Sequence, residues 1–315
     1  MKTILVTPRG YARYGGEARK RLEALGYTMD INDTGKPVPR EVFVEKAKEA
    51  TGIIVGVDEL DADLLKECKN LKAVVKFGVG VDNIDLPTCD AMGIKVGRCV
   101  GSNSNAVAEL TMGMMFAAAR DLVSNAMEVK NGGWSKPTGF ELYQKKLGIF
   151  GFGNIGKHVA RMAHGIGMEV MVYDVFDIPK ADLEPYGAVQ TDKEAILKEC
   201  DFVTLHIPLL DSTRDFISTE EFKMMKPTAV IINAARGGII NEHALYEALK
   251  NKEIKACASD VWTSEPPLAS GEEWVAELLK MDNFILTAHI ASRSQEAEIN
   301  TVNMSTDTMI QLLTE

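Results

Sequence analysis

The sequence has few cysteines, no long apolar run and a deficit of positive charge, and each shortage excludes a class of protein. Its five cysteines show no C-x-x-C spacing, so we expect neither a disulfide framework nor a metal site. The net charge of −10 opposes nonspecific attraction to nucleic acid or to an anionic membrane surface. Any anionic ligand must therefore be bound by a local cluster of positive charge.

The apolar stretches are also too short for targeting or membrane insertion. The longest, residues 106–119, contains Glu109 and falls short of the roughly 20 residues that a membrane span needs. The N-terminus is apolar only from Ile4 to Val6 before Pro8 follows, which is too short for the core of a signal peptide. We therefore expect a cytoplasmic protein with no membrane partner and no nucleic-acid partner.

The sequence does contain the composition and patterning of an α/β protein. At 315 residues, with 46% hydrophobic and 25% charged residues, the chain is long enough for two globular domains. Short β-branched runs alternate with helix-length segments, as in parallel sheets. The predicted strands form two series: residues 4–6, 53–55 and 73–75, then 147–150, 170–173, 202–205, 230–232, 254–258 and 284–286. The second series predicts a doubly wound sheet.

Two predicted helices decide how the chain divides. The segment that follows Asn103 is apolar almost all round, so it must be covered by the other domain or by another subunit. The final helix, residues 295–313, is expected to pack back on the first domain. We therefore assign residues 1–98 and 290–315 to one discontinuous domain and residues 99–289 to a second.

A glycine-rich hexapeptide marks a dinucleotide site. It follows a predicted strand and opens a helix, and its members are Gly151, Phe152, Gly153, Asn154, Ile155 and Gly156. Glycines there permit a tight turn and a close approach of the backbone to a pyrophosphate at the helix N-terminus. Asp174 follows the next strand at the spacing of a ribose ligand, with Asp177 as an alternative. No arginine follows Asp174, so NAD is expected rather than NADP.

Three polar residues come after separate strands of the second series, where ligands bind in open α/β sheets. His289 suits proton exchange with a hydroxyl or carbonyl because the pKa of histidine lies near neutrality. Glu265 would fix the histidine tautomer and favour the imidazolium, and Arg236 would orient a substrate carboxylate. Taken singly, each has an ordinary structural explanation. His289 would be a buried histidine with its hydrogen bonds made, Glu265 a surface carboxylate, and Arg236 a turn residue in a salt bridge. Their joint occurrence predicts a catalytic set.

With these motifs the sequence resembles the D-isomer-specific 2-hydroxyacid dehydrogenase family, which includes D-3-phosphoglycerate dehydrogenase. The resemblance covers nearly the whole chain and implies two doubly wound parallel-sheet domains, a Rossmann-type cofactor domain and a flavodoxin-like substrate domain. It implies catalysis by Arg236, Glu265 and His289, and a homodimer formed partly by the helix after Asn103. Ala288 departs from the proline that usually precedes the catalytic histidine. We expect a short form without the C-terminal regulatory extension.

The same resemblance assigns binding roles to further residues. Cofactor contacts are implied for His206, Pro208, Ala234 and Asp260, the last with the nicotinamide carboxamide. The backbone of the loop that contains Gly78, Val79 and Gly80 would receive the substrate carboxylate. A glycine-rich turn after a strand is the plainer interpretation of that loop.

Local charge suggests the kind of substrate. Arg9, Arg13 and Lys76 follow strands of the first domain and would hold a distal phosphate, with Tyr11 or Tyr14 closing over it. A solvated basic surface is the alternative interpretation. We expect a small anion, 3-phosphoglycerate or its oxidised form, or else glyoxylate, hydroxypyruvate or another short 2-oxo acid. Two other interpretations remain open. One is a formate or phosphite dehydrogenase, which fits poorly because formate enzymes carry glutamine in place of Glu265. The other is a non-catalytic NAD-sensing corepressor.

Overall fold

The computed structural model describes residues 2–314, which form two compact units. Unit 1 contains the residues up to Asn103 together with those from Ser292 onward, and unit 2 contains Ser104–Ala291. The domain limits proposed from the sequence, 98/99 and 289/290, lie a few residues before these two crossings. Each unit is built on one parallel sheet with helices on its faces, so the predicted α/β class is confirmed.

Unit 1 has a five-stranded sheet in the order β2-β1-β3-β4-β5. Its strands are β1 (Thr3–Val6), β2 (Thr28–Ile31), β3 (Gly52–Val55), β4 (Ala73–Lys76) and β5 (Lys95–Arg98). The central strands β1, β3 and β4 are almost wholly buried and are the three that the sequence predicts. The edge strands β2 and β5 are largely exposed or half-buried and were not predicted.

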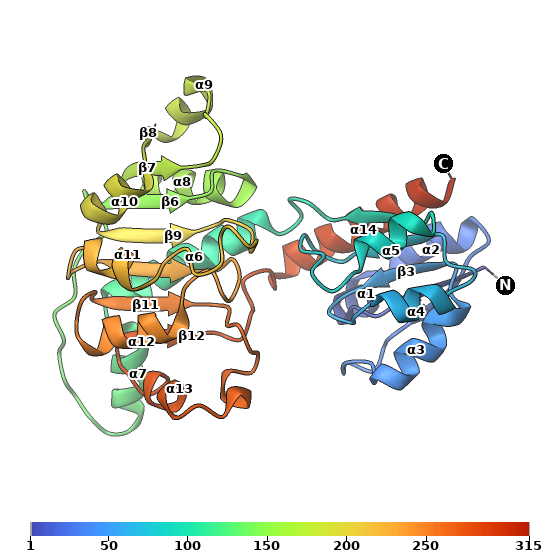
Figure 1. Ribbon diagram of the computed structural model, residues 1–315, viewed down its shortest axis with the longest axis horizontal. Coiled ribbons are helices and arrows are strands. Elements are labelled where there is room, and N and C mark those ends of the chain that lie inside the picture. Colours follow the sequence, from blue (N-terminus) through green and yellow to red (C-terminus); the bar gives the residue numbers. More distant parts are fainter. Residues whose placement is uncertain (1, 315) are drawn as a thin grey trace. The chain divides into compact units, whose positions relative to one another are not determined.

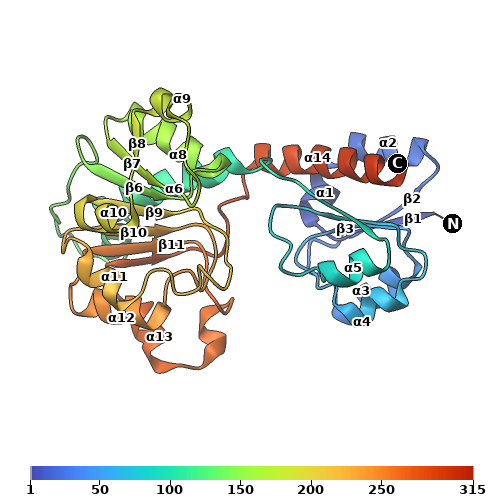
Figure 2. The ribbon, with the colours of Figure 1, turned by 45° about the horizontal axis from the view of Figure 1, so that its top comes forward.

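Helices cover both faces of this sheet (Figure 2). The helices are α1 (Arg9–Tyr14), α2 (Gly16–Ala24), α3 (Arg40–Glu49), α4 (Ala62–Glu67), α5 (Leu86–Ala91) and α14 (Gln295–Thr314). α1, α2 and α14 bury Tyr11, Leu22 and Met309 on one face. α3, α4 and α5 pack on the other face. The final helix therefore completes the core of unit 1.

Unit 2 has a seven-stranded sheet in the order β12-β11-β10-β9-β6-β7-β8. Its strands are β6 (Lys146–Phe150), β7 (Glu169–Tyr173), β8 (Ala188–Gln190), β9 (Phe202–Leu205), β10 (Val230–Asn233), β11 (Ala256–Ser259) and β12 (Phe284–Leu286). Six of them match predicted strands, and the short edge strand β8 was missed. The order reverses at β6, so the carboxyl ends of β6 and β9 flank the switch point at which doubly wound sheets bind ligands.

Two sets of helices cover the faces of the second sheet (Figure 1). The helices are α6 (Ser104–Ala119), α7 (Leu122–Lys130), α8 (Asn154–Gly165), α9 (Lys180–Leu183), α10 (Lys193–Glu199), α11 (Thr219–Met224), α12 (Glu242–Lys250) and α13 (Glu273–Leu278), with short 3-10 turns η1 (Glu184–Tyr186) and η2 (Pro267–Ser270). α6 and α8 bury one face, and α10 to α13 bury the other.

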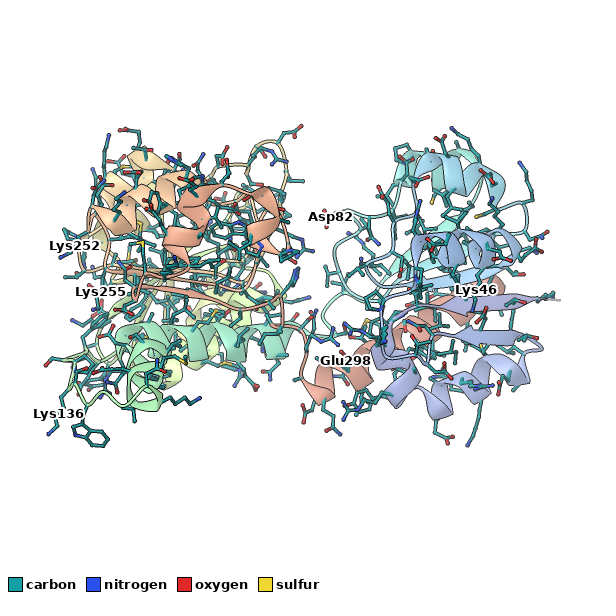
Figure 3. All side chains as sticks on the ribbon, turned by 90° about the horizontal axis from the view of Figure 1, so that it is seen from below. Lys46, Asp82, Lys136, Lys252, Lys255 and Glu298 are labelled. Atoms are coloured by element: carbon teal, nitrogen blue, oxygen red, sulfur yellow. The ribbon has the colours of Figure 1, made fainter. Side chains whose placement is uncertain are left out.

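The apolar segment after Asn103 is two helices rather than one. α6 ends before Asp121, whose φ of +49° turns the chain into α7. Lys255 is labelled in Figure 3. Its Nζ lies 3.9 Å from Asp121 Oδ1 and sits over the ring of Phe140, and these contacts brace the turn. α6 buries ten of its side chains within unit 2, whereas α7 buries none. In the part of the chain that the structure describes, no helix is both long and apolar enough to cross a membrane.

Candidate active site

The turn between β6 and α8 has room for a pyrophosphate beside its amide groups. A Cβ on Gly153 would meet no atom within 4 Å, so open space adjoins the first turn of α8. A Cβ on Gly151 would lie 2.6 Å from the carbonyl oxygen of His206, and one on Gly156 would lie 2.1 Å from that of Gly151. Two glycines are thus required by packing and the third leaves a cradle, which fits a dinucleotide.

Asp174 directly follows β7, beside this turn. Its Oδ2 accepts a hydrogen bond from the backbone N–H of Phe152 at 2.8 Å, and its Oδ1 accepts a longer one from Phe176 at 3.4 Å. The carboxylate is therefore held against the glycine turn while Val175 and Phe176 stay exposed. A carboxylate at this point would accept ribose hydroxyls and repel a 2′-phosphate.

His206 follows β9 on the other side of the switch point. Its Nε2 shares a hydrogen bond with Thr204 Oγ1 at 3.0 Å, and its buried Nδ1 has no partner among the described residues. Burial lowers the pKa of His206 to about 3, so the ring is neutral at physiological pH. The unpartnered Nδ1 of His206 fits a site at which a bound ligand supplies the missing hydrogen bond. Pro208, two residues further on, is exposed.

Arg236 lies on a turn after β10 that its own neighbours hold in shape. The side chain of Asn233 donates to the carbonyl of Arg236 at 2.9 Å and accepts from the N–H of Ala235 at 3.1 Å. The guanidinium Nη1 donates to the carbonyl of Ala235 at 2.8 Å, and the side chain is half-buried. Ala234, a predicted cofactor contact, is buried at the start of this turn.

The carboxyl ends of β10, β11 and β12 lie side by side because the three strands pair in register. Asn233 pairs with Ser259, and Ser259 pairs with Leu286. The chain leaves these three positions toward Arg236, Glu265 and His289 respectively. The sheet therefore brings the loops of the three predicted catalytic residues to one edge of unit 2.

Glu265 and His289 form a direct pair. Both carboxylate oxygens of Glu265 lie 3.1 Å from Nδ1 of His289. A carboxylate only accepts hydrogen bonds, so Nδ1 carries the proton, and Nε2 is the nitrogen that can exchange a proton with a ligand. Both side chains are partly exposed, at 46% for His289 and 42% for Glu265.

Asp260 is fully buried and anchors the loop that carries His289. Its carboxylate accepts hydrogen bonds from the hydroxyl of Thr287 and from the N–H groups of Ile290 and Ala291, at 2.9 and 2.7 Å for the last two. The sequence did not predict this role, although a buried carboxylate after a strand of small residues needs such partners. A contact between Asp260 and the nicotinamide carboxamide stays a prediction.

The comparison with protein families decides what kind of protein this is. Residues 112–291 match the NAD-binding domain of the D-isomer specific 2-hydroxyacid dehydrogenases. The chain belongs to this family. The match confirms both the predicted family and NAD as the cofactor, and it covers the glycine turn, Asp174 and all three residues of the catalytic set. Relatives of the chain are named as dehydrogenases and reductases.

Individual relatives in the 2-hydroxyacid dehydrogenase family differ in length. The chain is 39% identical over 286 residues to D-3-phosphoglycerate dehydrogenase of Methanocaldococcus jannaschii, covering 90% of this chain and 52% of that protein. It is 38% identical over 282 residues to hydroxypyruvate reductase of Thermotoga maritima, covering 89% and 87%. The chain thus spans about half of the first relative and most of the second.

Solved structures of the family share the fold. The structure of D-lactate dehydrogenase from Aquifex aeolicus, complexed with NAD and lactic acid, superposes with a TM-score of 0.83 at 29% identity. The superposition covers 99% of this chain and 96% of that one. The two-sheet architecture described above is therefore the architecture of the dehydrogenase family.

In unit 1, the loop after β4 presents unused backbone donors. Gly78 has a φ of +148°, and its carbonyl accepts from the N–H of Cys99 at 2.8 Å. The N–H groups of Val79 and Gly80 donate to no acceptor in residues 2–314. Backbone donors of this kind suit a carboxylate, which is the role that the sequence assigns to the loop.

The proposed phosphate ligands of unit 1 have partners of their own. The Nζ of Lys76 donates to the carbonyl of Gly56 at 2.6 Å and to Oδ1 of Asn83 at 2.5 Å. Arg9 is exposed and donates to the carbonyl of Gly35 at 3.4 Å, and Arg13 stacks on Tyr14. Tyr11 is fully buried against Thr306, so the expectation that it closes over a substrate was wrong. Tyr11 lies on the side of α1 that faces the core of unit 1, which explains its burial.

Proposed function

We propose that this chain transfers a hydride between NAD and C2 of a short D-2-hydroxy acid or the corresponding 2-oxo acid. The observation that carries the proposal is the bidentate contact of Glu265 with Nδ1 of His289 at 3.1 Å. Family membership supplies the reaction class, and this pair supplies the proton exchange that an alcohol–ketone interconversion requires.

His289 moves the proton at its Nε2. In reduction, the imidazolium donates that proton to the oxygen on C2, and the neutral ring that results keeps its remaining proton on Nδ1. In oxidation, the neutral Nε2 accepts the hydroxyl proton. Glu265 holds the ring in the tautomer that both directions need and stabilises the charged form through its two oxygens.

Arg236 orients the substrate. Its guanidinium forms a planar fork that matches a carboxylate, and Asn233 fixes the turn that presents it. In unit 1, the N–H groups of Val79 and Gly80 are a separate set of donors that suits a carboxylate. The glycine turn, Asp174 and His206 would hold NAD, which supplies or takes up the hydride when bound.

The side chains of unit 1 favour a substrate without a distal phosphate. The ammonium group of Lys76 donates two hydrogen bonds, to Gly56 and Asn83, which tie it to the neighbouring loop. Tyr11 lies in the core and closes over nothing. A short 2-oxo acid such as glyoxylate or hydroxypyruvate is therefore our first candidate, and hydroxypyruvate reductase of Thermotoga maritima is matched over most of its length.

A second candidate is 3-phosphoglycerate or its oxidised form. It is supported by the 39% identity to a D-3-phosphoglycerate dehydrogenase and by Arg9 and Arg13, which remain exposed after β1. If these arginines bind phosphate, Arg9→Ala and Arg13→Ala should lower kcat/KM for the phosphorylated 2-oxo acid alone. Each lost charge-assisted hydrogen bond is expected to cost about 1.5 to 3 kcal/mol.

Turnover of NADH with glyoxylate, hydroxypyruvate, phosphohydroxypyruvate and pyruvate tests the proposal directly. We expect rates with one or more short 2-oxo acids, with kcat/KM higher for hydroxypyruvate than for its phosphorylated counterpart. The reverse preference would select the second candidate. NADH binding by fluorescence without turnover on any of the acids would refute the enzymatic proposal and favour an NAD-sensing binding protein.

We further propose that the dehydrogenase forms a homodimer through α7 and the end of α6. α7 buries none of its side chains within the chain, and apolar residues there are exposed. They are Phe116, Leu122, Val123, Met127 and Val129, with Trp134 just beyond the helix. Exposed apolar groups in such number favour an interface, and a second copy brings the same surface.

Light scattering after gel filtration tests the dimer. Wild type should elute with twice the mass of the chain, and Leu122→Glu with Met127→Glu should give the monomer because charges would be buried at the interface. Val189→Glu, at an exposed apolar residue on β8, is the control and should leave the mass unchanged. A monomeric wild type would refute the homodimer.

A further inference from the structure

The turn that carries Arg236 and the loop that carries Glu265 touch through their backbones. A Cβ on Gly237 would lie 2.2 Å from the carbonyl carbon of Trp262 and 2.4 Å from the nitrogen of Thr263. Only a glycine allows that approach. The N–H of Trp262 in turn donates to Oε1 of Glu265 at 3.2 Å, so the position of this backbone bears on the catalytic carboxylate.

One side chain fastens the two segments at this contact. Glu242 lies in the first turn of α12, shortly after the Arg236 turn. Its Oε1 accepts a hydrogen bond from the backbone N–H of Thr263 at 2.7 Å and another from the hydroxyl of Thr263 at 2.8 Å. Thr263 stands two residues before Glu265. Glu242 therefore holds the Glu265 loop from the element that follows Arg236.

The surroundings of Glu242 are unfavourable to its charge. Burial raises the pKa of Glu242, and the charges of Asp215 and Glu272 act in the same direction, against the two bonds from Thr263. A carboxylate in such surroundings costs stability unless its contacts compensate. Both contacts that compensate lead to the Glu265 loop.

We propose that Glu242 is a positioning residue that fixes the Glu265 loop against the Arg236 turn and so sets the geometry of the Glu265–His289 pair. This role rests on the proposed function, because it acts through the catalytic carboxylate. It concerns no atom of the substrate or of the cofactor.

The atoms involved define the variants. Glu242→Ala removes the acceptor and leaves the N–H and hydroxyl of Thr263 without it, so the loop should loosen. Glu242→Gln keeps an oxygen where both bonds end and should restore most of the activity that Glu242→Ala loses. Glu247, on the same helix, accepts a hydrogen bond from Asn251 at 3.5 Å. Among the described residues it has no hydrogen bond to the Glu265 loop, so Glu247→Ala is the matched control.

The deciding experiment measures kcat for Glu242→Ala in two backgrounds, the natural chain and Glu265→Ala. In the natural chain we expect Glu242→Ala to lower kcat by about 10- to 100-fold, since small misplacements of catalytic groups have effects of this order. In the Glu265→Ala background we expect Glu242→Ala to lower kcat by less than about threefold, because the side chain that Glu242 positions is already gone. KM should change little in either background.

Hydrogen exchange at the amide of Thr263 supplies a readout that does not depend on turnover. Exchange should accelerate in Glu242→Ala and stay unchanged in Glu247→Ala. Equal losses of kcat in both backgrounds, or unaltered exchange at Thr263, would overturn the positioning role while leaving the proposed function intact. Absence of wild-type turnover on every 2-oxo acid would instead overturn the function, and the role of Glu242 with it.

Discussion

His289 holds a backbone conformation that residues with a Cβ rarely adopt, with a φ of +52°. Such a conformation costs on the order of 1 to 3 kcal/mol and persists only where its surroundings enforce it. Here Asp260 enforces it, because its carbonyl accepts from the N–H of His289 at 2.8 Å and its carboxylate accepts from the next two amides. The imidazole is held toward Glu265 by the backbone as well as by the ion-pair contact.

Removing the imidazole should abolish proton exchange and little else. We expect His289→Ala to lower kcat by about 10²- to 10⁴-fold, the usual range for a lost general acid or base. NADH binding, measured by fluorescence, should stay near that of the natural chain because the glycine turn lies on other strands. Turnover close to wild type would refute the assignment of His289.

Glu265→Gln should lower kcat in both directions. The amide oxygen can still accept from Nδ1 of His289, but the neutral side chain no longer stabilises the imidazolium. The imidazolium is the proton donor in reduction and the product of proton transfer in oxidation, so both directions lose this stabilisation.

Initial rates of Glu265→Gln and of the natural chain, in both directions at one pH, measure this loss. Rates equal to those of the natural chain would contradict the role of Glu265.

At the scale of elements, the sequence predicts every central strand but only one of the four edge strands among the described residues, β12. β3 and β9 are buried at every residue because helices cover both sides. β2, β5 and β8 carry polar residues and border solvent, so their sequences have no strand periodicity to detect. Their place comes from pairing with a buried neighbour.

The candidate site divides in the same way. The residue types of Arg236, Glu265 and His289 and their position after strands are visible in the sequence, and the registered pairing of β10, β11 and β12 then brings their loops together. The supports of the site depend on contacts between distant segments, such as Glu242 with Thr263. No local pattern encodes a contact of that kind. Lys76 shows the same limit, because its bonds to Gly56 and Asn83 cannot be seen in the sequence.

The glycine turn between β6 and α8 allows two glycines with different duties to be compared. Gly153→Ala adds a methyl group where no atom lies within 4 Å, so thermal stability should persist while NADH affinity falls by about tenfold or more. Gly156→Ala places a Cβ 2.1 Å from the carbonyl of Gly151 and should destabilise the fold by about 1 to 3 kcal/mol.

Calorimetry and fluorescence titration measure both quantities on the same samples. Unchanged NADH affinity in a stable Gly153→Ala would show that no phosphate approaches this turn. Equal loss of stability in the two variants would show that the open space at Gly153 is not available to a ligand.

For the whole molecule, the two units can be followed separately. All three tryptophans, Trp134, Trp262 and Trp274, belong to unit 2, whereas helical circular dichroism reports both units. Unit 1 depends on α14, whose Val302 and Met309 are 1% and 0% exposed in its core. A change confined to α14 should therefore leave the tryptophan fluorescence unaltered.

Met309→Ala should destabilise unit 1 alone, by about 2 to 5 kcal/mol, because it leaves a cavity beside β3. Denaturant unfolding should show an earlier transition by circular dichroism and an unmoved transition by tryptophan fluorescence. Asn300→Ala, at an exposed residue of the same helix, is the control. A tryptophan transition that shifts as far as the dichroism would contradict the independence of the two cores.

The return of α14 to unit 1 also determines the order in which a nascent chain can mature. Domains commonly fold as they leave the ribosome, the amino-terminal one first. Here residues 104–291 are synthesised, and can close their sheet, before the helix that seals the amino-terminal core has been made. Until then the face of the first sheet that Val302 and Met309 cover is bare. Translation of unit 1 thus starts before that of unit 2 and is completed after it, and during that interval unit 1 is a natural client for chaperones.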